Sequence, residues 1–327
     1  MTSSSYLVCG GAGYIGSHMV QCLLDEGCRV VVLDDLSTGH SQAVGEARLV
    51  QGNILDPIVL DKVLGSQKFD GVLHFCALSL VGESVKRPLD YYRNNVAGTL
   101  SLLEAMRRHD VDRLVFSSTA AIFGEPLQDR IDEDHPKRPI NPYGRTKLMV
   151  EELLTDAANA YGLRSVALRY FNAAGARSDG SIGESHQPET HLIPNVLRSI
   201  RDGDGSLKVF GDDYPTPDGT CVRDYVHVDD LARAHLAALA WMEKREGAHA
   251  FNLGNGQGFS VLEVMQAAGR VTGKPVAYEV CDRRPGDPAT LVASAERAHE
   301  QLGWKPEYTD IESIIETAWR WHLDQRY

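Results

Sequence analysis

The chain has 327 residues, which predicts about two domains at roughly 150 residues each and enough length to bury a sizeable core. Its 33 basic and 45 acidic residues give a formal charge of −12, so we expect binding neither to nucleic acid nor to anionic membranes. No stretch approaches about 18 uncharged apolar residues, and the N-terminus lacks the pattern of a signal peptide. We therefore expect a cytoplasmic protein without a membrane span.

The six cysteines and twelve histidines show no spacing that is typical of a metal site. No Cys-x-x-Cys pair is present, and no Cys/His pattern matches a zinc site. We expect the cysteines to be reduced and mostly buried, and we expect no metal site.

The N-terminal elements predict a strand–helix–strand unit. A short apolar run at 6–9 ends in glycines, a helical pattern follows over 14–26, and a β-branched run covers 29–33. That second run is apolar almost without alternation, as in strands that are covered on both faces. The three elements fit a βαβ unit.

The same alternation continues to about residue 172 and predicts a doubly wound parallel sheet of the Rossmann type, in a first domain over 1–172. Further strands are expected at 48–50, 71–75, 113–117 and 165–169, and further helices at 88–108 and 142–161.

After residue 172 the composition changes, and we expect a smaller α/β domain over 173–327 that covers the carboxyl ends of the sheet, with the chain free to cross back to the first domain. Segments 173–190 and 212–219 are predicted loops. Helices are expected at 192–201 and 229–244, and a strand at 250–253. Ser260 and Glu263 form the pattern of a capping box that opens one more helix.

The glycine loop and the acid beyond it predict a dinucleotide site. Gly10, Gly13 and Gly16 lie between a strand and a helix, where glycine lets the backbone approach a pyrophosphate and the helix N-terminus offers N–H groups. Asp34 ends the second strand about 20 residues further on, where a carboxylate accepts hydrogen bonds from ribose hydroxyls. A carboxylate there repels a 2′-phosphate, so NAD is favoured over NADP.

A tyrosine and a lysine at helical spacing predict the chemistry. Tyr143 and Lys147 share one face of the helix at 142–161. The phenol has an ordinary pKa near 10, and a nearby positive charge would lower that pKa toward the range of a useful general base. Ser117 and Thr119 end the preceding strand, so a hydroxyl can hydrogen-bond the reacting oxygen.

With these features in place, the chain resembles the extended short-chain dehydrogenase/reductase family, and within it the enzymes that epimerise UDP-linked hexoses. The resemblance extends over nearly the whole length. It is carried by GGAGYIGS at 10–17, VGESV at 81–85, NNVAGT at 94–99, YGRTKLMVE at 143–151, RYFN at 169–172 and FGDDYPTPDGTCVRDY at 210–225.

The resemblance implies reversible inversion of carbon 4 in UDP-glucose and UDP-galactose through a 4-keto sugar, with Tyr143 as base, Lys147 tuning it and Thr119 as the catalytic hydroxyl. It also implies a homodimer packed through 88–108 and 149–161. The residues expected to bind NAD are Gly10, Gly13, Tyr14, Ile15, Gly16, Asp34, Asn53, Ile54, Phe75, Asn95, Ser117, Tyr143, Lys147 and Tyr170. Those expected to bind the substrate are Thr119, Tyr143, Asn172, His191, Leu192, Phe210, Arg223, Arg284, Asp287 and Leu291.

Several alternatives stay open. Leu291 stands where a larger aromatic residue is found in glucose-restricted members, which leaves room for an N-acetyl group. A 4,6-dehydratase is disfavoured because Thr119 is followed by two alanines instead of an acidic pair. A pentose or uronate 4-epimerase, a UDP-glucuronate decarboxylase and a non-catalytic NAD sensor remain, although a sensor would have no need of Tyr143 and Lys147.

Overall fold

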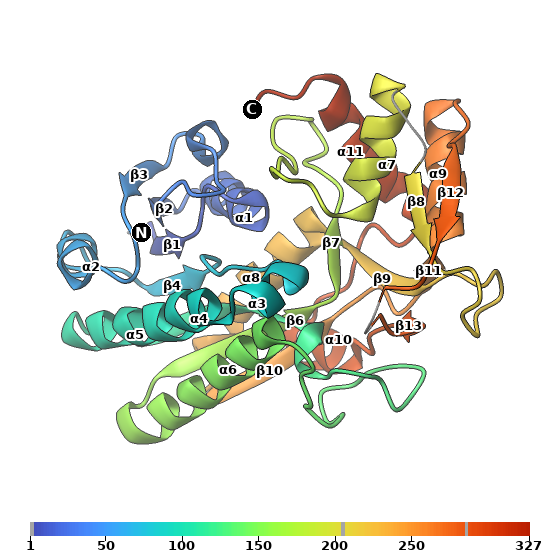
Figure 1. Ribbon diagram of the computed structural model, residues 1–327. Coiled ribbons are helices and arrows are strands. Elements are labelled where there is room, and N and C mark those ends of the chain that lie inside the picture. Colours follow the sequence, from blue (N-terminus) through green and yellow to red (C-terminus); the bar gives the residue numbers. More distant parts are fainter. Residues whose placement is uncertain (1–2, 204–206, 285–286) are drawn as a thin grey trace.

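The computed structural model describes residues 3–203, 207–284 and 287–327, and its largest element is a seven-stranded sheet (Figure 1). The strand order is β10-β6-β5-β4-β1-β2-β3, and every neighbouring pair is parallel. This arrangement confirms the Rossmann-type doubly wound sheet. The strands are β1 (Ser5–Cys9), β2 (Arg29–Asp34), β3 (Arg48–Gln51), β4 (Gly71–His74), β5 (Arg113–Thr119), β6 (Arg164–Tyr170) and β10 (Ala248–Leu253).

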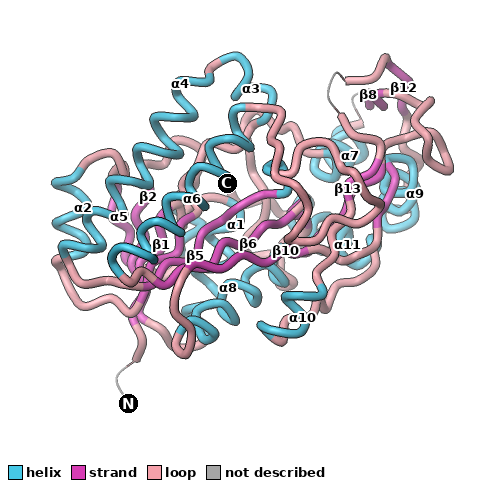
Figure 2. Tube along the Cα trace, turned by 90° about the horizontal axis from the view of Figure 1, so that it is seen from below, coloured by secondary structure: helices cyan, strands magenta, loops and turns pink. Residues whose placement is uncertain are grey.

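Helices cover both faces of this sheet, and Figure 2 shows α5 and α6 on one side of the strands with α8 and α10 on the other. Alternate residues of β1 explain the two layers, because Leu7 packs in the cluster with α2, α5 and α6, whereas Val8 packs in the cluster with α1 and α8. The helices are α1 (Tyr14–Asp25), α2 (Pro57–Leu64), α5 (Gly98–Arg108), α6 (Pro142–Tyr161), α8 (Val228–Met242) and α10 (Glu296–Leu302).

The segment predicted as one helix over 88–108 is helical but not uniform. It consists of α4 (Pro88–Tyr91), a π-helical stretch at Tyr92–Ala97, and α5, and it follows the short helix α3 (Val81–Lys86). The prediction of a single α-helix is therefore wrong in its middle. Wider π turns occur mainly at functional sites, and here the wide turn carries Asn95, whose amide donates to both Leu78 O and Thr146 Oγ1 at 3.0 Å.

The rest of the second half forms two small sheets and a helical layer. In the first sheet β9 pairs with three strands, antiparallel to β11 and parallel to β13 and β7; in the second, β8 pairs with β12. A separate apolar cluster joins the three helices of this layer. These elements are β7 (Asn172–Ala174), β8 (Leu207–Phe210), β9 (Val222–His227), β11 (Gly258–Ser260), β12 (Tyr278–Cys281), β13 (Thr290–Leu291), α7 (Leu192–Asp202), α9 (Val261–Thr272) and α11 (Ile311–Leu323).

Three elements from the second half of the chain belong to the large sheet or cover it, namely α8, β10 and α10. Helix α8 packs against α1, and β10 pairs in parallel with β6 along its whole length. The predicted capping box is confirmed, since Ser260 Oγ accepts from Glu263 N and the Glu263 carboxylate accepts from Ser260 N. The segment 173–190 begins as strand β7 and is otherwise irregular apart from turns. Within the described residues, no helix combines the length and apolar character that crossing a membrane requires.

Candidate active site

The glycine loop is a backbone cradle between β1 and α1. Gly10 has φ +80°, and a Cβ atom on it would lie 2.5 Å from Cys76 N. A Cβ on Gly16 would lie 2.1 Å from Gly10 O, so α1 can approach the loop this closely only because residue 16 is a glycine. Gly13 caps α1 without a side-chain hydrogen bond, which leaves the first N–H groups of the helix available to an anion.

A small cavity adjoins this loop at the carboxyl ends of β1, β2 and β4. No residue that lines it in the described part of the chain is an arginine or lysine, in keeping with a dinucleotide that lacks a 2′-phosphate. The predicted cofactor residues on its wall are Gly10, Gly13, Asp34, Asn53, Ile54 and Phe75. The glycine cradle and this acidic, cation-free wall fit NAD.

Asp34 is held rigidly at the end of β2. Its Oδ2 accepts from Ala12 N at 2.9 Å and its Oδ1 from Leu36 N at 2.8 Å. Burial raises the pKa of Asp34, and the two backbone hydrogen bonds oppose that rise. Each carboxylate oxygen has a second lone pair for a ribose hydroxyl. Nearby, Asn53 donates to Asp35 Oδ2 at 2.8 Å.

Other predicted cofactor residues lie away from this cavity wall. Tyr14, Ile15, Gly16, Asn95, Ser117, Tyr143, Lys147 and Tyr170 are absent from the lining in the described chain. Asn95 is 2% exposed, and its side chain forms hydrogen bonds with Leu78, Asn94 and Thr146. Its two bonds to the Leu78 backbone hold the loop after β4 in place. Its neighbour Asn94 does line the cavity, one position from the residue that the sequence indicated.

The tyrosine–lysine pair lies at the carboxyl end of β5, as the sequence predicted. Helix α6 begins after Asn141, whose Oδ1 accepts from Gly144 N at 2.8 Å. Lys147 Nζ donates to Ser117 O at 2.6 Å and lies 5.8 Å from the centre of the Tyr143 ring. The hydroxyl of Tyr170 donates to Ser117 Oγ. Three hydroxyl side chains and one amine therefore converge at the ends of β5 and β6.

Burial sets the protonation of this pair. Burial raises the pKa of Tyr143, and a hydrogen bond with Thr119 opposes the rise. Burial also lowers the pKa of Lys147 to about 7, against the charges of Cys76 and Glu151. The sequence predicted a pKa of Tyr143 lowered by the ammonium together with oxidised nicotinamide; within the chain alone, desolvation prevails. A phenolate here needs positive charge beyond that of a partly protonated lysine.

A larger cavity of about 660 Å³ lies between β7, α7, β9 and the segment before β13. This volume is in the range of small-molecule sites. Its wall includes seven predicted substrate residues, namely Asn172, His191, Leu192, Phe210, Arg223, Arg284 and Asp287. Residues from distant parts of the sequence therefore meet as the resemblance implied.

Arg223 and Arg284 are two of the three arginines on the described wall of the larger cavity, the third being Arg198. Arg223 Nη2 is 3.3 Å from Asp287 Oδ1, and its Nη1 donates to Pro288 O at 2.9 Å. The guanidinium of Arg284 lies 3.9 Å above the centre of the Phe210 ring. These contacts hold both cations at the cavity, where guanidinium groups suit phosphate oxygens.

Three predicted substrate residues lie outside the larger cavity. Thr119 and Tyr143 belong to the cluster at the end of β5, and Leu291 in β13 packs against the small apolar cluster of Ile122 and Phe123. In the sheet, β5 has β6 on one side and, on the other, the strands that border the dinucleotide cavity. Asn172, which comes shortly after β6 in the chain, lies on the wall of the larger cavity. The tyrosine–lysine pair thus lies between the two cavities in sheet order.

Sequence reasoning missed Glu184 and Thr190 on the wall of the larger cavity. Their signal is weak, because polar residues are ordinary in a segment predicted as a loop. Glu184, however, belongs to a regular spacing with His186, Glu189 and His191 that could have marked it.

The chain matches one family and many of its characterised members. The model of the NAD dependent epimerase/dehydratase family matches residues 6–254. The UDP-glucose 4-epimerase of Halalkalibacterium halodurans is 52% identical over 97% of this chain and 95% of its own length. The structure of UDP-glucose 4-epimerase from Brucella ovis in complex with NAD is 49% identical, with a TM-score of 0.94, covering 97% of this chain and 98% of that one. The enzyme from Bifidobacterium longum in complex with NAD+ and UDP is 37% identical, with a TM-score of 0.93 and coverages of 98% and 99%.

Proposed function

The chain belongs to the NAD dependent epimerase/dehydratase family, and on that premise we propose that it interconverts UDP-glucose and UDP-galactose by inverting carbon 4 of the hexose. The observation that carries the proposal is the buried Tyr143–Lys147 pair at the end of β5, between a dinucleotide cavity and a larger cavity whose wall includes Arg223 and Arg284. Both cavities are needed because the alcohol that is oxidised and the acceptor of its hydride must meet at one acid–base group.

NAD, when bound, supplies a hydride acceptor at carbon 4 that also returns the hydride. The chain's own residues would hold it: the glycine cradle and the N-terminus of α1 would receive the pyrophosphate, and Asp34 the adenosine ribose. Lys147 and the hydroxyl groups of Ser117 and Tyr170, at the ends of β5 and β6, would line the nicotinamide end.

Tyr143 moves the proton in both halves of the reaction. Its phenolate oxygen accepts the proton of the 4-hydroxyl, and Thr119 hydrogen-bonds the same oxygen of the sugar. The 4-keto sugar then turns about its diphosphate linkage and presents its other face. Tyr143 gives the proton back to the oxygen, and carbon 4 has the opposite configuration.

The larger cavity anchors the part of the substrate that does not turn. Arg223 and Arg284 bind the diphosphate with Asn172, and Asp287 and the Phe210 backbone bind the uridine. With binding concentrated on UDP, the sugar keeps the freedom to turn over, which the mechanism requires.

The sugar specificity rests on the surroundings of Leu291. This aliphatic side chain packs with Ile122 and Phe123 instead of lining the larger cavity. We propose that UDP-N-acetylhexosamines are accepted as well. Turnover of UDP-N-acetylglucosamine below about a thousandth of that of UDP-glucose would contradict this, since steric pockets alone discriminate weakly.

We also propose two domains and a homodimer. The first domain is 1–172 joined by the returning α8 and β10, and the second is the remainder of 173–327. Exposed apolar side chains support a dimer through α3, α4, α5 and α6: Val81, Val85, Leu89, Leu100, Met149 and Tyr161. The six cysteines are all described and all unpaired, which supports a cytoplasmic location.

Two measurements test the function and the assembly. The purified protein is incubated separately with UDP-galactose, UDP-N-acetylgalactosamine and UDP-glucuronate, and we expect UDP-glucose from the first; conversion of UDP-glucuronate alone would contradict the proposal. Light scattering after size exclusion should give a dimer that Leu89→Glu dissociates. Ile58→Glu, equally exposed on α2 but outside this face, should leave it intact. A dimer in both variants would contradict the assigned interface.

A further inference from the structure

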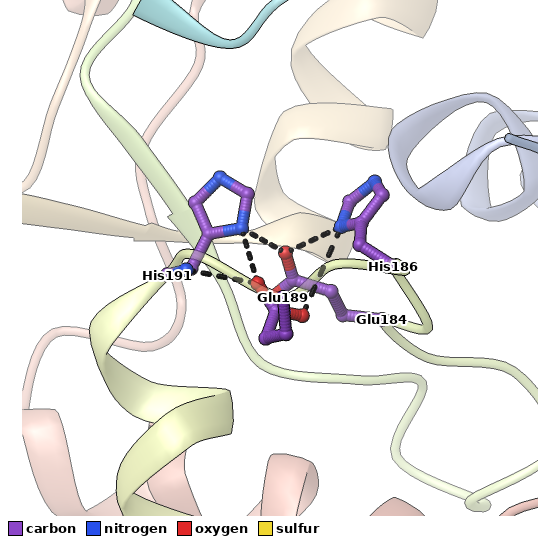
Figure 3. A group of neighbouring side chains, drawn as sticks. All are labelled: Glu184, His186, Glu189 and His191. Carbon is purple, nitrogen blue, oxygen red and sulfur yellow. Dashed lines mark hydrogen bonds and ion pairs between the residues drawn. The ribbon is translucent and has the colours of Figure 1, made fainter. Parts of the chain in front are cut away.

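Four side chains of the segment between β7 and α7 point toward one another (Figure 3). They are Glu184, His186, Glu189 and His191, and one nitrogen or oxygen of each lies within 4.8 Å of the others. We call them the 184–191 cluster. Glu184 and His191 line the larger cavity, whereas the acid–base chemistry at Tyr143 uses none of the four.

The spacing of these atoms is close to that around one small cation. His191 Nδ1 lies 2.7 Å from Glu184 Oε1 and 2.8 Å from Glu189 Oε1, and His186 Nδ1 lies 3.0 Å from Glu184 Oε1. Zinc ligands at about 2.0–2.1 Å from the metal in a tetrahedral site lie about 3.3 Å apart. These three pairs are already close to that spacing, and the remaining pairs, which lie up to 4.8 Å apart, would have to close further around an ion.

One buried atom of the cluster has no hydrogen-bond partner. The Glu189 side chain is 1% exposed, and its Oε1 accepts from the backbone N–H groups of Thr190 and His191. Its Oε2 is buried without a hydrogen bond and lies 3.9 Å from His186 Nδ1. A buried carboxylate oxygen without a partner is costly unless a cation or a donor occupies the space before it.

Two buried carboxylates meet two imidazole nitrogens at the centre of the cluster. The side chains of Glu184 and Glu189 are 6% and 1% exposed, and each has an oxygen within 3.0 Å of a histidine Nδ1. Carboxylates with so little access to water favour a cation between them.

We propose that the 184–191 cluster binds one divalent transition-metal ion, of which Zn²⁺ is the type that two imidazoles and two carboxylates suit best. Imidazole nitrogen and carboxylate oxygen are ordinary zinc ligands, and a site with four protein ligands is structural because no position stays open for chemistry. Binding requires the neutral form of both imidazoles, so any proton that they carry is released to solvent, and it involves no redox change.

The ion would fix one wall of the larger cavity. Glu184 is already anchored, since its carbonyl oxygen accepts from Trp321 Nε1 at 2.9 Å in α11. His191 immediately precedes α7 as its N-terminal cap residue. A metal joining them ties the irregular segment to two helices and stabilises the folded chain by mass action.

The test is a metal titration of the full-length protein after removal of metal with a chelator. We expect one Zn²⁺ per chain, a higher Tm with Zn²⁺, and for Co²⁺ a visible spectrum of nitrogen and oxygen ligands without thiolate charge transfer. His186→Ala and the conservative Glu189→Gln should each weaken Zn²⁺ binding at least about tenfold. His249→Ala, a histidine of β10 outside the cluster, should bind Zn²⁺ as the wild type does.

Four results would overturn the proposal: no stoichiometric binding, binding that survives both cluster variants, a thiolate spectrum from the cysteines, or no shift of Tm with Zn²⁺. An unchanged circular dichroism spectrum of Glu189→Gln keeps a loss of binding distinct from misfolding. Because none of these readouts is turnover, failure here leaves the proposed epimerase activity untouched. Absence of any Tm shift would identify the cluster as an ion-pair network only.

Discussion

The two cavities are built in different ways. The dinucleotide cavity is shaped by backbone, at glycines and strand ends within the first 100 residues, and its main polar side chain, Asp34, is fixed by two backbone N–H groups. The larger cavity is shaped by side chains from segments between 172 and 322, where Arg223 and Asp287 hold one another. Backbone-built sites depend on local sequence, whereas side-chain-built sites depend on how distant segments pack.

The largest effect is expected where the two regions meet. Tyr143→Phe removes the proton-transferring oxygen, so turnover of UDP-galactose should fall by at least about 10³-fold, within the range of general acid–base catalysis. Binding of NAD and of UDP, measured by calorimetry, should stay near wild type. Tyr161→Phe, an exposed tyrosine of the same helix, is the matched control. Near-normal turnover in Tyr143→Phe would show that a group other than Tyr143 transfers the proton.

A pH profile tests whether α8, from the second half of the chain, is part of the first region's core. Burial lowers the pKa of His235 in α8 to about 4. Between pH 6.5 and 4 the unfolded chain binds a proton that the native imidazole does not, so stability falls as pH drops, by up to about 1.4 kcal/mol per pH unit. Denaturant unfolding of His235→Leu should lose this slope. Parallel profiles for both proteins would contradict a buried neutral imidazole.

Arg223→Lys probes the side-chain-built region. A lysine keeps the charge but cannot make the bidentate contact, so we expect KM for UDP-galactose to rise about 10- to 100-fold, in line with about 1.5–3 kcal/mol for a charged hydrogen bond. NAD binding should not change. Arg270→Lys, whose guanidinium pairs with Glu312 on the surface, should have ordinary kinetics. Equal effects of the two variants would remove Arg223 from the substrate site.

Gly16→Ala probes the backbone-built region. The added Cβ would meet Gly10 O at 2.1 Å, so α1 must move from the loop, and we expect a loss of about 1–3 kcal/mol together with weaker NAD binding. Gly82→Ala in α3 meets nothing within 4 Å and should stabilise by up to about 1 kcal/mol. Chemical denaturation and NAD titration measure both. An undisturbed Gly16→Ala protein would show that the cradle is adaptable.

The sequence predicts the first region well because its signals are local. The turn at Gly10, the start of α1 and the acid at Asp34 follow from neighbours within about thirty residues, and the Rossmann-type sheet is confirmed. The pairing of β10 with β6 has no local signal in the sequence, because an apolar run predicts a strand without indicating which strand it pairs with. The π turn at Tyr92–Ala97 likewise depends on contacts of Asn95 with distant residues.

Within the site, residue types were easier to predict than positions. Asn94 lines the dinucleotide cavity next to the predicted Asn95, which remains a prediction, and both belong to the π-helical stretch. Leu291 packs beside the cavity and not on its wall. The residues of the 184–191 cluster are regularly spaced in the sequence. In a segment without helical or strand periodicity, however, the spacing does not predict which way the side chains point.

The return of the chain to the large sheet limits how the protein can be divided. A fragment that stops at residue 172 would lose β10 and α8 together. The outer edge of β6 would then offer unpaired backbone groups to other molecules, and the face of α1 that packs against α8 would be exposed to water. Such a truncation is expected to aggregate, so the cofactor half reaches its native form only after translation has passed residue 253.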